Sequence, residues 1–222
     1  MREPTPLPIA PCTSCPQHET ALFNPVPPIL PSSLTHPPLI ILLPAPSTDS
    51  RSGSILASRT YRLVSSAFIP LLPPISPIFI PILRCVVTAP SRVKPAFYTT
   101  CSRTHLLPTL LSLLPHLPPT PTPILCIGAP AVRSLHSLLH SPCSQAEAFS
   151  TQGSVFPLPS TPFSIQRFAT LDPAEILLRP ERKSTAFSHL SLLSTHLSGS
   201  PPAISTPTIV PPGPPPTQGA SQ

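Results

Sequence analysis

Two cysteines near the start of the chain, Cys12 and Cys15, have residue types and a spacing that could do chemistry. Thiolates separated by two residues can chelate zinc or exchange with a disulfide, and His18 follows three residues later. A structural zinc site needs four ligands, and no second pair with matching spacing follows. The pair also lacks the strand-then-helix context of a thioredoxin-like motif. We therefore expect no metal or redox site, and we interpret Cys12, Cys15 and the other cysteines as unrelated reduced thiols.

A second group, His136, His140 and Cys143, could share one face of a helix at spacings of four and three residues. Pro142 would break the last turn of that helix, which argues against a ligand set. The chain has no Gly-x-Ser-x-Gly motif and no phosphate-binding glycine loop, and it carries only 7 acidic residues. The sequence thus predicts no enzyme, no cofactor, and no catalytic, cofactor-binding or metal-binding residues.

The elements that would have to position such groups are limited by proline, which supplies 41 of the 222 residues. Proline fixes φ and has no backbone N–H, so it interrupts helices and sheet ladders. We therefore expect a mostly disordered, proline-rich, low-complexity chain with no globular fold. Isolated short helices are the most that this pattern allows, at about 55–68, 131–140, 173–178 and 184–198.

The most protein-like part of the sequence is 170–199. Asp172 can cap a helix, Pro173 suits its first position, and Glu175 lies three residues after the cap. Gly199 would end the next helix. The apolar stripe of that helix consists of Ala186, Leu190, Leu193 and Leu197.

Proline content and apolar runs divide the chain into six segments. We expect proline-rich disorder at 1–46, a helix within 47–69, a proline-rich apolar and extended or polyproline II segment at 70–130, mostly disorder at 131–169, a short helical segment at 170–199 and a disordered proline-rich tail at 200–222. One apolar run, 39–43, resembles an edge strand but has no evident partner strand.

The net charge of +6 comes from dispersed arginines, and the chain has only 2 tyrosines. We therefore expect no nucleic-acid partner, since neither a basic patch nor an aromatic ladder is present. No secretory signal is evident at the first residues. The uncharged stretch 63–83 has the length of a membrane span but contains five prolines, which argues against spanning. Localisation and protein partners stay undetermined.

The sequence supports no specific biochemical function. Pro, Leu, Ser and Phe make up half of the chain, and most of their codons begin with two pyrimidines. This bias predicts a spurious, antisense or very young reading frame of a pyrimidine-rich strand. The alternative is a proline-rich interaction or scaffold protein that uses the amphipathic helix 184–198, and the second alternative is a small membrane-associated protein that uses 63–83.

Overall fold

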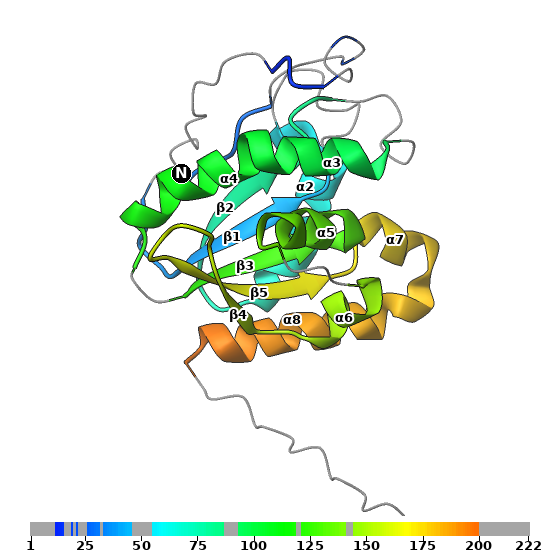
Figure 1. Ribbon diagram of the computed structural model, residues 1–222. Coiled ribbons are helices and arrows are strands. Elements are labelled where there is room, and N and C mark those ends of the chain that lie inside the picture. Colours follow the sequence, from blue (N-terminus) through cyan, green and yellow to red (C-terminus); the bar gives the residue numbers. More distant parts are fainter. Residues whose placement is uncertain are drawn as a thin grey trace, which may run out of the picture.

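Five strands form one mixed sheet at the centre of the computed structural model (Figure 1). The structure describes residues 12–15, 19, 21, 26–31, 33–45, 55–86, 93–118, 121–140 and 144–199. The strands are β1 (Pro38–Leu43), β2 (Ser76–Pro81), β3 (Thr122–Ile127), β4 (Ser154–Pro157) and β5 (Ser164–Thr170). Their order is β2-β1-β3-β5-β4, in which β4 alone runs antiparallel to its neighbour.

Helices connect the strands and cover both faces of the sheet. The α-helices are α2 (Arg59–Leu63), α3 (Pro95–Cys101), α4 (Leu107–Leu113), α5 (Gly128–Leu138), α6 (Gln145–Ser150), α7 (Pro173–Leu178) and α8 (Lys183–Leu197). The 3-10 segments are η2 (Ile55–Ala57), η4 (Ile69–Leu71), η7 (Leu114–His116) and η8 (Pro180–Arg182), and the π-helical segments are η3 (Val64–Phe68) and η6 (Ser102–Leu106).

Alternate residues of the central strands enter two separate apolar clusters. Ile40 and Leu42 of β1 pack with α4 and α5, whereas Leu39, Ile41 and Leu43 pack with η2, η3 and α8. This alternation follows from the period of two in a strand. Figure 1 shows α3, α4 and α5 over one face of the sheet. The molecule is therefore a three-layer α/β structure in which the parallel strands are buried on both faces.

The expectation of a mostly disordered chain without a globular fold is wrong. The description of the protein as disordered and low in complexity is wrong as well. Proline occupies positions where its chemistry is tolerated. Pro95, Pro173 and Pro180 stand in the first turn of their helices, where the missing N–H has no intrahelical partner. Two more prolines lie in β2, an outer strand of the sheet.

Two prolines inside helical stretches follow π-helical turns. Pro70 comes after η3, and Pro108 comes after η6. A proline in a regular helix clashes with the carbonyl four residues earlier, and a wider π turn relieves that clash. This arrangement lets α3, η6 and α4 follow one another without a break in the helical path. The interval 70–130, expected to be extended or polyproline II, thus holds β2, β3 and this long helical stretch.

The expected helix positions are largely confirmed. Helical segments cover 55–57 and 59–71, α5 covers most of 131–140, and α7 and α8 match the two C-terminal expectations. The Asp172 side chain caps α7 by accepting a hydrogen bond from the Ala174 N–H at 2.8 Å. These helices are packed rather than isolated, which is the part that sequence reasoning missed.

Two further expectations are corrected by the packing. The run 39–43 belongs to β1, which lies between β2 and β3 rather than at an edge. The apolar stripe of α8 packs inside the domain, with Ala186, Leu190 and Leu193 all buried. Leu190 and Leu193 pack with residues of β1, β3 and β5.

Candidate functional site

The carboxyl ends of the four parallel strands gather at one edge of the sheet. Between β1 and β3 the connections diverge, because β1 leads to β2 on one side and β3 leads towards β5 on the other. Open α/β sheets bind ligands outside the carboxyl ends of their strands at such a switch point. A ligand site is therefore expected among the loops and helix N-termini at this edge.

Gly128 makes the sharp turn from β3 into α5 at this edge. Its φ is +75°, a left-handed conformation that glycine adopts without a steric penalty. A Cβ at this position would lie 3.3 Å from the Cβ of Asp172, which follows β5. The turn leaves the first N–H groups of α5 facing the edge of the sheet, where a helix has unsatisfied donors and partial positive charge.

A cavity of about 240 Å³ lies between the first turns of α3 and α5. We call it the α3–α5 pocket. Its lining consists of Val93, Pro95, Tyr98, Thr99, Pro130, Arg133 and Ser134. This volume is below the range of pockets that hold drug-sized ligands, so the pocket fits a small molecule or a single ionic group.

Ser134 contributes a buried hydroxyl to the α3–α5 pocket. The residue is 2% exposed, and its Oγ has no hydrogen-bond partner. A buried hydroxyl without a partner costs free energy, and a ligand is one of the ordinary explanations for such a group. Ser134 therefore marks the wall of the pocket where a hydrogen bond is missing.

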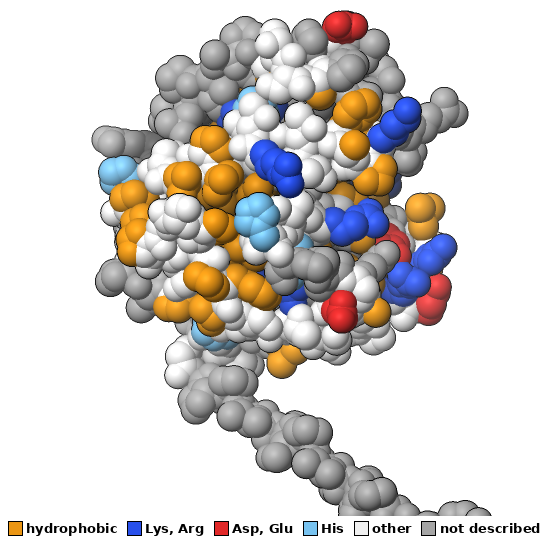
Figure 2. All heavy atoms as spheres, in the orientation of Figure 1, with side chains coloured by type: hydrophobic (Ala, Val, Ile, Leu, Met, Phe, Trp, Pro, Cys, Tyr) orange, Lys and Arg blue, Asp and Glu red, His pale blue; other side chains and the backbone are white. Residues whose placement is uncertain are grey.

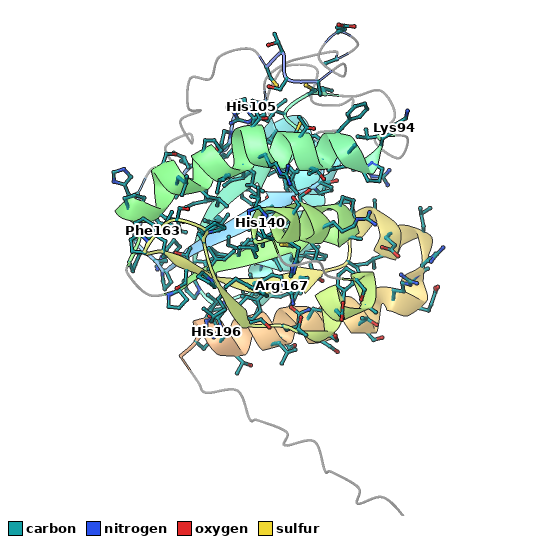
Figure 3. All side chains as sticks on the ribbon, viewed as in Figure 1. Lys94, His105, His140, Phe163, Arg167 and His196 are labelled. Atoms are coloured by element: carbon teal, nitrogen blue, oxygen red, sulfur yellow. The ribbon has the colours of Figure 1, made fainter. Side chains whose placement is uncertain are left out.

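Positive charge surrounds the entrance of the α3–α5 pocket. Arg133 lines the pocket and is exposed, and Lys94 is the exposed N-cap residue of α3. Figure 2 shows Lys and Arg side chains over this end of the molecule, whereas hydrophobic side chains gather over α4. Figure 3 places Lys94 at the free end of α3. An anion would meet both charges as it approaches.

Tyr98, which lines the pocket, and Asp172, which follows β5, have raised pKa values. Burial raises the pKa of Tyr98 to about 12, the Arg133 charge opposes this rise, and Asp172 adds to it. Burial also raises the pKa of Asp172, against the lowering effect of the Ala174 N–H. The Tyr98 hydroxyl is therefore neutral at pH 7 and can donate a hydrogen bond.

A cluster of thiols lies next to this pocket. We use the term thiol cluster for Cys12, Cys15, Cys85 and Cys101, all of which are buried. One contact of the cluster joins Cys12 Sγ to His105 Nε2, at 2.8 Å. Figure 3 shows His105 on the helical stretch beneath the N-terminal segment. The contact thus unites a residue at the start of the chain with η6.

The thiols of the cluster influence one another. Burial raises the pKa of Cys85 to about 11, and the charges of Cys12 and Cys15 raise it further. Burial likewise raises the pKa of Cys101 to about 12, with smaller contributions from the other three thiols. Cys85 and Cys101 are therefore protonated at neutral pH.

Arg84 brings a cation into the thiol cluster. It is 3% exposed, and its Nη2 has no hydrogen-bond partner. Burial lowers the pKa of this guanidinium, while negative charge on Cys12 or Cys101 counteracts that effect. A thiolate in the cluster would accordingly be stabilised by Arg84.

The cysteine and histidine groups singled out from the sequence have different outcomes. Cys12 and Cys15 lie in one cluster, and His18 lies outside the described residues. His136 contacts the buried Arg167 at 2.5 Å, and Cys143 also falls outside the described part of the chain. Across the described ranges, no three His, Cys, Asp or Glu side chains are arranged to hold a metal ion.

Sequence reasoning missed the residues that form the α3–α5 pocket. A signal for Gly128 exists, because a buried apolar run followed by a single glycine and a helical pattern is typical of a strand–turn–helix connection. Tyr98, Arg133 and Ser134 carry no local signal, since the sheet topology alone brings α3 beside α5.

Comparisons with known proteins found no matching family model and no matching curated protein. In the part of the chain that the structure describes, no helix combines the length and apolar character needed to cross a bilayer. The stretch 63–83 is divided among the end of α2, η3, η4 and β2.

Proposed function

We propose that this protein is an α/β ligand-binding domain that holds a small oxyanion, such as a phosphate group, in the α3–α5 pocket. The observation that carries the proposal is the buried Ser134 Oγ, which lines the pocket and has no hydrogen-bond partner. The proposal is for binding and includes no catalytic step.

The start of α5 supports an anionic ligand. Helix N-termini bind phosphate and carboxylate groups through free backbone N–H donors and the helix dipole. The missing side chain of Gly128 lets Asp172 approach the start of α5, and Pro130 removes one of the donors. The Arg133 guanidinium can add charge-assisted hydrogen bonds from the same helix.

The charge at the pocket also favours an anion. Lys94 and Arg133 are positive, and Asp172 is the nearby acidic residue whose carboxylate is engaged by the Ala174 N–H. The neutral Tyr98 hydroxyl can donate to an oxyanion as well. These groups leave an excess of positive charge and donors around a cavity of about 240 Å³.

Calorimetric titration of the full chain with inorganic phosphate tests the proposal, with ionic strength held constant by chloride to separate binding from screening. Arg133→Met should weaken binding by about tenfold, which corresponds to the loss of one hydrogen bond to a charged group. Ser134→Ala should weaken it by a smaller factor.

The matched control is Arg59→Met. Arg59 is exposed on α2, which belongs to the layer that covers the other face of the sheet. Its replacement removes the same charge and should leave phosphate affinity within about twofold, since a distant surface charge is largely screened. Equal losses in the Arg59 and Arg133 variants would refute a localised site.

A further inference from the structure

One member of the thiol cluster, Cys12, lies beside an imidazole. Cys12 Sγ lies 2.8 Å from His105 Nε2, within reach of a proton acceptor. Burial and the Arg84 charge lower the pKa of His105, so its imidazole is neutral at pH 7 and able to accept a proton. A thiol paired with an imidazole base is the arrangement that activates a nucleophilic cysteine.

Arg84 and the other thiols complete the electrostatic surroundings of Cys12. The buried Arg84 guanidinium has an Nη2 without a hydrogen-bond partner and interacts with negative charge at Cys12. Cys85 and Cys101 face the same cluster and stay protonated at neutral pH. Cys12 therefore has both a proton acceptor and a cation beside it, and Arg84 has a donor left for a small polar reactant.

We propose that Cys12 and Cys15 form a peroxide-reactive dithiol, in which Cys12 is the nucleophile and Cys15 the resolving thiol. Hydrogen peroxide is the oxidant. It is hardly larger than water, and Thr13 and Ser14 between the two buried cysteines are exposed. His105 is itself only half-buried.

The reaction has two steps. His105 accepts the proton of Cys12, and the thiolate attacks one peroxide oxygen, which breaks the O–O bond and forms a sulfenic acid on Cys12. The hydroxide that leaves takes the proton from His105 and becomes water. The Cys15 thiol then displaces the sulfenic hydroxyl as a second water and closes the disulfide between Cys12 and Cys15. One peroxide is reduced, and two thiols are oxidised.

Mass spectrometry of the full chain after reduction, desalting and peroxide treatment tests this proposal. We expect the first loss of two thiols to map to Cys12 and Cys15 as a disulfide. In Cys15→Ser the reaction should stop at the sulfenic acid, which dimedone traps on Cys12. Cys126 is an internal control in every sample, because it is completely buried in β3 and burial raises its pKa to about 12.

The His105→Gln variant distinguishes a role of His105 as proton acceptor from a purely structural role. The variant should react roughly 100-fold more slowly at pH 7, which is the size that a general base contributes. It should approach the wild-type rate at a pH where hydroxide ionises the thiol, and a purely structural loss would not recover in this way. Circular dichroism of the variants checks that the fold is retained.

Three results would overturn the proposal. Cys12 could react no faster than Cys126, or Cys15 could be oxidised equally fast in Cys12→Ser. Native mass spectrometry could instead find one metal ion per chain that is lost in both cysteine variants, which would make the thiol cluster a metal site.

Discussion

Gly128 and Asp172 face each other across the carboxyl ends of β3 and β5, so closely that a Cβ on Gly128 would lie 3.3 Å from the Asp172 Cβ. The two residues begin α5 and cap α7, the helices that follow adjacent strands. This close approach packs the turn at the start of α5 against the cap of α7.

Replacement of Gly128 by alanine should destabilise the protein by more than the cost of its backbone conformation. A left-handed residue with a side chain costs about 1–2 kcal/mol, and here the new methyl group also presses on Asp172. Gly199→Ala is the matched control, because Gly199 has φ +70° and a Cβ added there would meet nothing within 4 Å. Urea denaturation measures both, and an equal or smaller loss in Gly128→Ala would show that the Asp172 contact is unimportant.

The raised pKa of Asp172 predicts a specific pH dependence of stability. A carboxyl group with a folded pKa above its unfolded value of about 3.9 stabilises the fold fully below that value, and this contribution is lost as pH rises through the folded pKa. Asp172→Asn keeps a capping side chain without the ionisation. The free energy of unfolding of wild type relative to this variant should therefore fall as the pH rises from below the unfolded pKa through the raised folded pKa. A rise of this free-energy difference instead of a fall would mean that folding lowers the pKa of Asp172.

Two neighbouring leucines of α8 test whether its apolar stripe is part of the core. Leu193 is completely buried, and Leu192 is 48% exposed. Leu193→Ala should cost about 2–5 kcal/mol of unfolding free energy, whereas Leu192→Ala should change it by only about 0.5 kcal/mol. The substitutions have the same intrinsic helix propensity, so the difference reports packing. Similar small losses in both variants would favour a helix that is not packed on the sheet.

The sequence predicted individual helices better than the fold. The α7 cap was predictable from Asp172 and Pro173 because capping depends on neighbouring residues. The capping box of α6, formed by Ser144 and Glu147, had the same kind of local signal and was missed. Of the strands, only β1 was anticipated, as an edge strand without a partner. A strand buried on both faces is a plain apolar run, which by itself does not show that it pairs with others.

The candidate site was beyond prediction because its contacts are non-local. Cys12 and His105 are 93 positions apart in the sequence, and only the packing of the N-terminal segment on η6 brings them together. Ser134 likewise becomes a pocket residue only when α3 lies beside α5. Short spacing drew attention to Cys12 and Cys15, which were expected to be unrelated thiols, and to none of the pocket residues.

The prediction that the reading frame is spurious, antisense or very young is independent of the fold. Half of the chain consists of residues with pyrimidine-rich codons, and protein packing gives no reason for that bias. The prediction is an excess of pyrimidines at synonymous third positions of the coding strand. Third positions without such an excess would show that the composition was selected at the protein level.

The most direct test of the proposed oxyanion site is a titration of the isotope-labelled full chain with inorganic phosphate, followed by amide NMR. The account predicts saturable shifts at the Gly128, Ala129 and Ala131 amides and at Ser134, with the same apparent affinity at each, and their loss in Arg133→Met. Shifts that do not saturate, or that are centred away from the start of α5, would contradict it.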